Sequence, residues 1–401
     1  MIASSPPLAS RRWPAPVACV SLALALLAAL VGIVTALPQN APATSSATAV
    51  TAPVFLDAPL GPLNCTAFNQ AVSAAAWRGA VTTVLSIANA TRYGDAPRTV
   101  TIMLKRNTTS PNARVPAVVW WHGTGDQPLQ HTEMFDTLPN VLFIAPSSAI
   151  GPSLFEWSTV LAPKMFDVWL MDDLAACLAQ SSLVDTNRIY AMGFSAGGIH
   201  ASHLSLLRPH YLAASILHSG GLVSTPYAQV NSADSSSSPY AKQSTRLPPV
   251  LAITGGPNDK FLIVNFTQTT SAYAVTYLSR KRALGLTVDS WSAPSPLAQC
   301  THTAGHKISL PYQAVAMVAA TSFAGNFDVN APAAANLTNM PVCNVLQQKD
   351  FPLVLANATD ATKAVAASNP AGNGAVGATG VPRMGGAVGA VVLAIAALAV
   401  L

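Results

Sequence analysis

Charged side chains are scarce in this chain. Only 9% of its 401 residues are Asp, Glu, Lys or Arg, whereas a typical soluble domain has about 25%. The formal net charge of +5 is small, and the basic residues form no cluster or stripe, so the sequence does not favour a nucleic-acid partner. The five cysteines include no C-x-x-C pair, which argues against a zinc site built on cysteine.

The amino-terminal region is apolar behind a basic start. Arg11 and Arg12 precede an apolar run from Val17 to Val34, and Val34-Thr35-Ala36 offers small residues for cleavage. This order predicts a secretory signal peptide over residues 1–36. An uncleaved signal anchor is the alternative.

The carboxyl-terminal region has a similar character. Residues 387–401 carry no polar side chain and follow a stretch of mostly small residues. This pattern predicts a glycosylphosphatidylinositol (GPI) attachment signal over residues 374–401, with Asn373 as the attachment residue and Ser368 or Gly372 as alternatives. A retained carboxyl-terminal anchor is the other interpretation. Both place the protein at the extracellular face of the plasma membrane, and the first makes the membrane a partner through a lipid anchor.

Features between the ends agree with export. Six N-x-[ST] triplets predict glycosylation at Asn64, Asn89, Asn107, Asn265, Asn336 and Asn357. Apart from Cys19, in the signal, the cysteines are Cys65, Cys177, Cys300 and Cys343. An even number in an oxidising compartment predicts two disulfides, with three connectivities open.

The chain divides by composition. Residues 37–60 are rich in Ala, Pro, Ser and Thr and indicate a linker, residues 326–373 indicate an Ala/Pro-rich stalk, and residues 61–325 are expected to form one domain. A Ser-rich insertion, residues 224–246, is compatible with either a lid or a loop.

Short apolar runs alternate with helical patterns inside this domain. Strands are expected at residues 98–105, 117–121, 141–145, 188–194, 213–217, 249–254 and 286–291. Helices are expected at residues 165–179, 196–207, 266–284 and 312–323. Such alternation predicts an α/β fold with a mostly parallel central sheet and helices on both faces.

A nucleophile motif lies between a strand and a helix. Gly193-Phe194-Ser195-Ala196-Gly197 has the pattern G-x-S-x-G. In this context the chain turns sharply and lifts the serine hydroxyl above the sheet, with the helix amino terminus pointing at the reacting oxygen. Ser195 is therefore the candidate nucleophile.

A second motif predicts an oxyanion hole. His122-Gly123-Thr124 follows an early apolar strand, the position that supplies one backbone N–H in such enzymes. The predicted donors are the amides of Thr124 and Ala196. His122 is expected to hold the turn, and a catalytic role for it is the alternative.

The remaining catalytic groups are expected in later loops. Asp259 follows the strand at residues 249–254 and suits the acid better than Asp289, which lies in the middle of a predicted strand. His306 follows a glycine ahead of the last helix and suits the base better than His302. The order Ser195, Asp259, His306 is that of α/β-hydrolases.

With these residues in place, the chain from about Thr99 to Phe323 resembles the polyhydroxybutyrate-depolymerase and feruloyl-esterase group of α/β-hydrolases. The similar segments are Val184-Asp-Thr-Asn-Arg-Ile-Tyr-Ala-Met-Gly-Phe-Ser-Ala-Gly-Gly198, Phe166-Asp-Val168, Asp172-Asp-Leu174 and Trp157. The resemblance implies an α/β-hydrolase fold and hydrolysis of carboxylic esters, polymeric ones included, without metal or organic cofactor.

Two loops depart from that group. The base is often set in Gly-Gly-His-Thr-Trp, and here the segment is Ala304-Gly-His-Lys-Ile308. The acid loop usually reads His-Gly-x-x-Asp, and here it is Gly255-Gly-Pro-Asn-Asp259. The fold and the triad tolerate these changes, whereas the substrate stays open.

Other interpretations remain. His200 and His203, three residues apart on one helix, are compatible with a metal pair, but no third ligand is evident, so packing is the preferred interpretation. A serine peptidase on the same fold and a non-catalytic cell-surface protein on a hydrolase scaffold are the alternative functions.

Overall fold

A computed structural model gives the structure of the chain over twelve segments. The described residues are 54–77, 83–87, 93–94, 97–104, 113–128, 130, 140–148, 156–161, 165–223, 246–286, 295–308 and 343–346. The predicted signal peptide, the GPI signal, the insertion up to residue 245 and the helix at 312–323 lie outside them, as do Asn89, Asn107, Asn336, Asn357 and Asn373.

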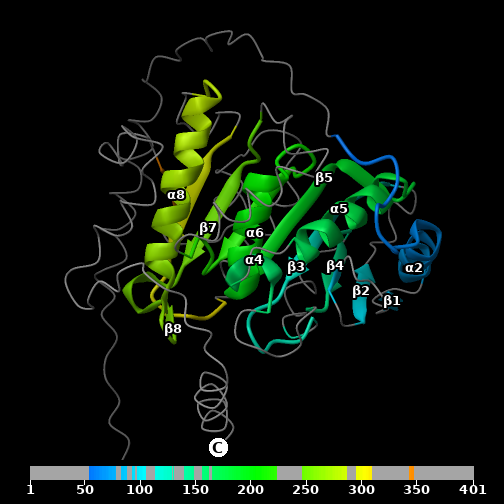
Figure 1. The fold of residues 1–401 in the computed structure, drawn as a ribbon, viewed down its shortest axis with the longest axis horizontal. Helices are drawn as coiled ribbons and strands as arrows, with labels where there is room; N and C mark the ends of the chain where they lie inside the picture. Colours follow the sequence, from blue (N-terminus) through cyan, green and yellow to red (C-terminus); the bar gives the residue numbers. More distant parts are fainter. Residues whose placement is uncertain are drawn as a thin grey trace, which may run out of the picture. The chain divides into compact units, whose positions relative to one another are not determined.

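A central sheet of nine strands organises the described residues (Figure 1). The strands run in the order β1-β2-β4-β3-β5-β6-β7-β10-β11. Their bounds are β1 Thr83–Ile87, β2 Arg98–Leu104, β3 Val115–Trp121, β4 Leu142–Pro146, β5 Val184–Phe194, β6 Ala214–His218, β7 Val250–Thr254, β10 Leu297–Thr301 and β11 Cys343–Val345. A separate hairpin pairs β8 Lys260–Phe261 with β9 Val264–Asn265.

The strand directions define the fold. The six strands from β4 to β10 in this order are parallel, whereas β1, β2 and β11 pair antiparallel with their neighbours. Among the described residues, α4 and α5 lie between β4 and β5, α6 between β5 and β6, and α8 between β7 and β10, as connections of parallel strands require. This strand order, with the antiparallel β2 beside β4, is the α/β-hydrolase fold, as the sequence predicted.

Five α-helices are described with the sheet. They are α2 Cys65–Trp77, α4 Ser158–Leu161, α5 Phe166–Ala179, α6 Ala196–Leu207 and α8 Phe266–Ala283. Figure 1 shows α8 beside β7, α6 beside β5, and α2 beside β1 and β2. None of the helices in the described part of the chain is long and apolar enough to cross a membrane.

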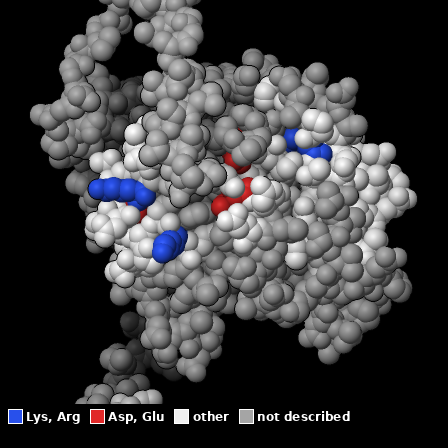
Figure 2. Space-filling model, turned by 90° about the horizontal axis from the view of Figure 1, so that it is seen from below, with Lys and Arg blue, Asp and Glu red and all other residues white. Residues whose placement is uncertain are grey.

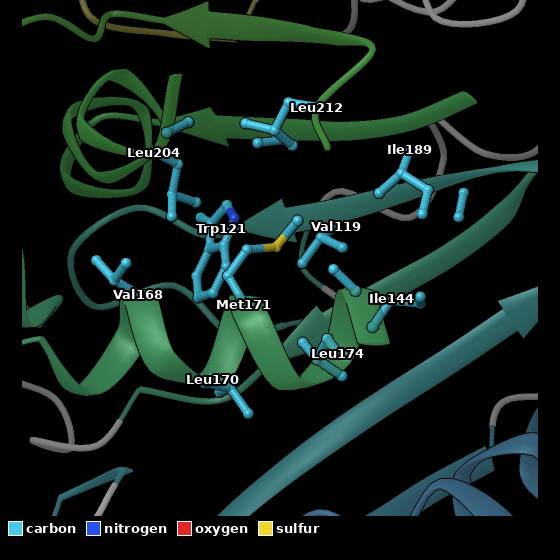
Figure 3. Packing of buried hydrophobic residues seen from close by; sticks show 14 of the residues in the cluster. Val119, Trp121, Ile144, Val168, Leu170, Met171, Leu174, Ile189, Leu204 and Leu212 are labelled. Atoms are coloured by element: carbon cyan, nitrogen blue, oxygen red, sulfur yellow. The ribbon is translucent and has the colours of Figure 1, made fainter. Parts of the chain in front are cut away.

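The strands are apolar on both faces because both faces are buried. Val119 and Trp121 of β3 belong to one core cluster, into which Met171 and Leu174 of α5 also pack (Figure 3). The intervening Trp120 belongs to a second cluster on the opposite face. All seven residues of β3 are buried, which explains its continuous run of apolar residues.

Some of the few charged side chains are buried in the interior. Three of the 16 acidic residues in the chain, Asp167, Asp172 and Asp173, lie on α5 and are buried. Asp167 pairs with the buried Arg98 at 2.6 Å, and Asp172 accepts two hydrogen bonds from Arg208 at 2.6 and 3.0 Å. Buried charges need such partners because an unpaired one is strongly destabilising.

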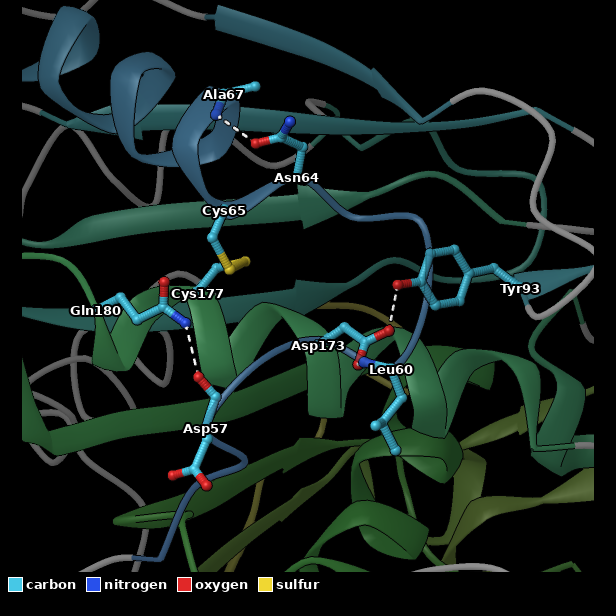
Figure 4. Close-up of a disulfide and its surroundings, with 9 residues drawn as sticks. All are labelled: Asp57, Leu60, Asn64, Cys65, Ala67, Tyr93, Asp173, Cys177 and Gln180. Carbon is cyan, nitrogen blue, oxygen red and sulfur yellow. Dashed lines mark hydrogen bonds between the residues drawn. A yellow bond between two sulfur atoms is a disulfide. The ribbon is translucent and has the colours of Figure 1, made fainter.

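A disulfide joins Cys65 of α2 to Cys177 of α5 (Figure 4). Cys300 is also disulfide-bonded, and its register partner across β10 and β11 is Cys343. Of the three connectivities left open by the sequence, the structure therefore contains the one that pairs Cys65 with Cys177.

Residues next to the predicted domain boundaries are part of the folded structure. Within the predicted linker, the backbone N–H of Leu60 donates to Asp173 at 2.8 Å (Figure 4), and the ring of Phe55 stacks on that of Tyr211. Within the predicted stalk, residues 343–345 form β11.

The secondary-structure predictions agree with the structure over most of the sheet. The helix expected at residues 196–207 has the bounds of α6, and the strand at residues 188–194 is longer than expected because β5 begins at Val184. The sequence missed α2, β1, β10 and β11. The strand expected at residues 286–291 falls outside the described residues except for Leu286, which is not in a strand.

Candidate active site

The candidate site lies at the carboxyl ends of four neighbouring strands. Ser195 follows β5, Ser219 follows β6, Asp259 lies in the loop after β7, and His306 lies in the segment after β10. Since these strands are adjacent and parallel, their carboxyl ends meet at one edge of the sheet, where open α/β sheets bind their ligands.

Ser195 occupies a strained turn. Its φ of 55° and ψ of −119° are unfavourable for a residue with a side chain and cost of order 1–3 kcal/mol. A Cβ on Gly197 would lie 1.8 Å from the carbonyl oxygen of Trp121, so only glycine fits beside the end of β3. The backbone N–H of Ser195 donates to the carbonyl of His218 at 2.9 Å, which holds the turn against β6.

The three predicted catalytic residues form a hydrogen-bonded chain. His306 Nε2 lies 3.0 Å from Ser195 Oγ, and His306 Nδ1 lies 2.7 Å from Asp259 Oδ1. A carboxylate only accepts hydrogen bonds, so Nδ1–H donates to Asp259 and Nε2 is left to accept the proton of Ser195. The structure thus brings together residues that are 47 and 111 positions apart.

Asp259 is fully buried and well supplied with donors. Its Oδ2 accepts from the Ser219 hydroxyl at 2.9 Å and from the Gly255 backbone N–H at 2.7 Å. Its Oδ1 remains for His306. The carboxylate is therefore fixed in orientation, which in turn fixes the imidazole.

Three phenylalanine rings surround His306. The ring centroids of Phe194, Phe261 and Phe266 lie 4.9, 5.5 and 4.4 Å from that of the imidazole, with interplanar angles of 25°, 28° and 18°. Stacking on these rings restricts the imidazole plane and limits water around it. The side chain of His306 is 12% exposed, so it remains accessible from the outside.

The loop after β3 carries the predicted oxyanion donor Thr124. The Gly125 N–H donates to Glu156 Oε1 at 2.8 Å, and Glu156 Oε2 lies 3.4 Å from His122 Nδ1. Trp157 Nε1 donates to the His122 carbonyl at 2.8 Å. These contacts from Glu156 and Trp157 fix the loop on both sides of Thr124.

The two predicted oxyanion donors lie after the end of β3 and at the start of α6. Ala196 is the first residue of α6, directly after Ser195. Thr124 follows the end of β3. Trp121, the last residue of β3, packs closely against Gly197 in the turn that carries Ser195. Their role as oxyanion donors stays a prediction.

His122 is buried and engaged with its own loop. Burial lowers its pKa, although the Gly123 carbonyl and Asp126 act in the opposite direction. Its Nδ1 lies 2.9 Å from the Gly123 carbonyl oxygen. These contacts fit the expected role of holding the turn.

The acid and base loops touch through their backbones. A Cβ on Gly255 would lie 1.9 Å from the Gly305 carbonyl oxygen, so glycine is required at position 255. The backbone N–H of His302 donates to the Thr254 carbonyl at 2.8 Å. His302 Nδ1 accepts from the Ala304 N–H at 3.1 Å, so His302 supports the base loop while His306 reaches Ser195.

The histidines of α6 pack in the core. His200 is fully buried, lies 4.3 Å from the ring of Trp121, and has its Nδ1 2.8 Å from the Thr159 hydroxyl. Across the described part of the chain, no three His, Cys, Asp or Glu side chains gather as metal ligands.

Two of the six predicted glycosylation residues are described. Asn64 is exposed, and its Oδ1 accepts from the Ala67 N–H at 3.1 Å (Figure 4). Asn265 is partly exposed, and its Oδ1 caps α8 by accepting from Thr267 and Gln268. In both, the cap uses the side-chain oxygen and not the amide nitrogen that carries a glycan.

Sequence reasoning missed several residues of this site. Ser219 and Glu156 were not singled out, and neither were the rings of Phe261 and Phe266. The positive φ of Ser219, 46°, has no strong sequence signal, because serine is not a residue typical of that conformation. Glu156 directly precedes Trp157, which is one of the residues that carry the family resemblance.

Comparisons with known proteins give only distant structural similarity. No family model matches the chain, and no curated protein matches it. The native form of pOPH is 15% identical, covering 66% of this chain and 94% of its own, with a TM-score of 0.45. A ferulic acid esterase is 12% identical, covering 60% and 96%, with a TM-score of 0.39. An S-formylglutathione hydrolase from Agrobacterium tumefaciens is 14% identical, covering 60% and 92%, with a TM-score of 0.39.

Proposed function

We propose that this protein is an extracellular serine esterase that hydrolyses carboxylic esters through Ser195, His306 and Asp259. The observation that carries the proposal is the hydrogen-bonded chain from Ser195 Oγ to His306 Nε2 at 3.0 Å and from His306 Nδ1 to Asp259 at 2.7 Å. The strained turn that presents Ser195 supports it, since such strain is typical of functional positions.

The proposed reaction is acyl transfer. His306 Nε2 takes the proton of Ser195 as Oγ attacks the ester carbonyl, and Asp259 stabilises the imidazolium that forms. The amides of Thr124 and Ala196 stabilise the oxyanion, a contribution of about 3–4 kcal/mol for each donor. The imidazolium protonates the leaving alcohol, and His306 then activates the water that hydrolyses the acyl-enzyme.

Ser195→Ala and His306→Ala test this mechanism. Either change is expected to lower kcat for p-nitrophenyl acetate by about 10⁴-fold or more, because the two groups act as a unit. Covalent labelling by a fluorophosphonate is expected in the wild type and absent in Ser195→Ala. A folded wild-type protein that neither labels nor hydrolyses esters would favour the non-catalytic surface protein, and faster cleavage of peptide anilides than of esters would favour the peptidase.

The same labelling experiment tests the cellular location. The apolar segments at both ends and the sequons support export and a lipid anchor. On intact cells, the labelled protein is expected at the surface and is expected to be released by a phosphatidylinositol-specific phospholipase C. Retention after this treatment would favour an uncleaved anchor.

A further inference from the structure

An apolar turn projects from the acid loop into solvent. The hairpin of β8 and β9 closes with the two residues Leu262 and Ile263. Leu262 is 57% exposed and Ile263 is 94% exposed, which makes Ile263 the most exposed large apolar side chain among the described residues. An isolated exposed apolar residue is ordinary, but two adjacent ones at the tip of a hairpin are not.

The local conformation disfavours these residues. The φ of Leu262 is 52°, while Ile263 has no positive φ. A two-residue hairpin turn with a positive φ only at its first position is of the type II′ kind, which takes glycine there. Leucine is strained in this conformation, and the exposure of both side chains gives no packing in return. Neither turn formation nor core packing explains Leu262 and Ile263.

The turn is joined closely to the catalytic residues. β8 begins directly after Asp259, and the Phe266 N–H donates to the Asp259 carbonyl at 2.9 Å, which closes the base of the hairpin. Phe261, the residue before the turn, has its ring 5.5 Å from that of His306. The tip of the hairpin is therefore adjacent in the chain to a ring that packs near His306.

Some charged side chains lie near the turn. Figure 2 views the molecule from the side on which β8 lies in Figure 1 and shows small groups of basic and acidic side chains among the described residues. The hairpin itself carries the exposed Lys260, before the apolar tip. The exposure of Ile263 also limits the kind of ligand, because a side chain that lined a cleft for one small ester would be partly covered by the walls of the cleft. An extended surface outside the protein fits better.

We propose that Leu262 and Ile263 dock on the apolar surface of a water-insoluble ester substrate and hold Ser195 and His306 at that surface. This inference rests on the proposed esterase function and specifies its substrate as an aggregated or solid ester. The two side chains leave water when they contact the surface, which is the source of the affinity.

Tributyrin tests the inference because one compound can be offered dissolved or as droplets. Wild-type protein is expected to show a further rise in rate when the concentration passes the solubility limit. The double variant Leu262→Gly, Ile263→Ser places a Gly-Ser pair in the turn, which favours the same hairpin. It is expected to keep the rate on dissolved tributyrin within about twofold and to adsorb to droplets about tenfold less.

Leu60→Ser is the matched control. Leu60 is 57% exposed, as Leu262 is, but lies beside α5 rather than in the acid loop. It is expected to leave both rates and adsorption unchanged. If the double variant adsorbs to droplets as the wild type does, the inference is overturned. An equal loss on dissolved and droplet tributyrin would also overturn it, since the turn would then serve single substrate molecules. Wild-type protein inactive on both dissolved tributyrin and droplets would instead contradict the esterase function itself.

Discussion

Three buried histidines dominate the expected response to acid at the residue scale. Burial lowers the pKa of His200 to about 3, of His203 to about 4 and of His210 to about 3. In the unfolded chain each has a pKa of about 6.5. Below that pH the unfolded state binds more protons than the folded state, so the stability from these residues is complete above pH 6.5 and falls as the pH decreases.

The free energy of unfolding is therefore expected to decrease from pH 7 to pH 5. Each histidine contributes up to about 1.4 kcal/mol per pH unit once the pH is well below 6.5. Burial raises the pKa of Asp167, but the charge of Arg98 lowers it overall. The carboxylate therefore affects stability only below about pH 4 and does not change the slope between pH 7 and pH 5. His122 and His302, whose pKa values burial also lowers, add to the slope. Urea unfolding at pH 7, 6 and 5 measures the slope, and His203→Gln is expected to reduce it by the contribution of one histidine. A free energy of unfolding that does not change between pH 7 and pH 5 would show that these histidines are not held neutral by burial.

At the scale of the element, the loop after β3 depends on one buried carboxylate. Glu156 accepts from Gly125 at 2.8 Å and faces His122 at 3.4 Å. Glu156→Ala removes both contacts and frees the segment that carries Thr124. The kcat for p-nitrophenyl acetate is expected to decrease about 10- to 100-fold, less than or similar to the loss of one oxyanion donor, with KM nearly unchanged.

Asp185→Asn is the control for this variant. Asp185 pairs with Arg188 at 2.6 Å in a partly exposed position, so its loss is expected to leave kcat unchanged. A similar decrease in both variants would show that general destabilisation, and not the position of Thr124, is responsible. A Glu156→Ala protein with wild-type kcat would show that the position of Thr124 does not depend on Glu156.

The elements predicted from the sequence are those whose pattern lies within a short segment of the chain. β3 and β7 are continuous apolar runs, and the turn at Ser195 has glycines at fixed spacing between a strand and a helix. β10 was missed because LAQCT contains polar residues and pairs with β7 across more than 40 residues of sequence. Ser219 and Glu156 act through contacts with residues 40 and 31 positions away, which no local pattern encodes.

At the scale of the whole molecule, the disulfide between α2 and α5 closes a separation of 112 residues. In the chain-entropy description a loop of about 100 residues gives about 4.7 kcal/mol, so Cys65→Ser with Cys177→Ala is expected to cost about 3–5 kcal/mol of stability. The midpoint of urea unfolding measures this loss. The kcat at 25 °C is expected to stay near that of the wild type, because α2 lies beside β1 and β2 and the site follows β5 to β10 (Figure 1).

Reduced wild-type protein serves as the comparison. Reduction also opens the disulfide of Cys300, so its midpoint is expected at or below that of the double variant. An unchanged midpoint in the double variant would mean that the packing of α2 on the domain, and not the covalent link, holds the amino-terminal part in place.

The backbone contact between Gly255 and Gly305 couples the acid loop to the base loop. A side chain at position 255 would collide with the carbonyl of Gly305, so a change at Gly255 needs a matching shift of the segment that carries His306. In an engineered library of this protein, the two loops are therefore expected to be exchangeable only as a single unit.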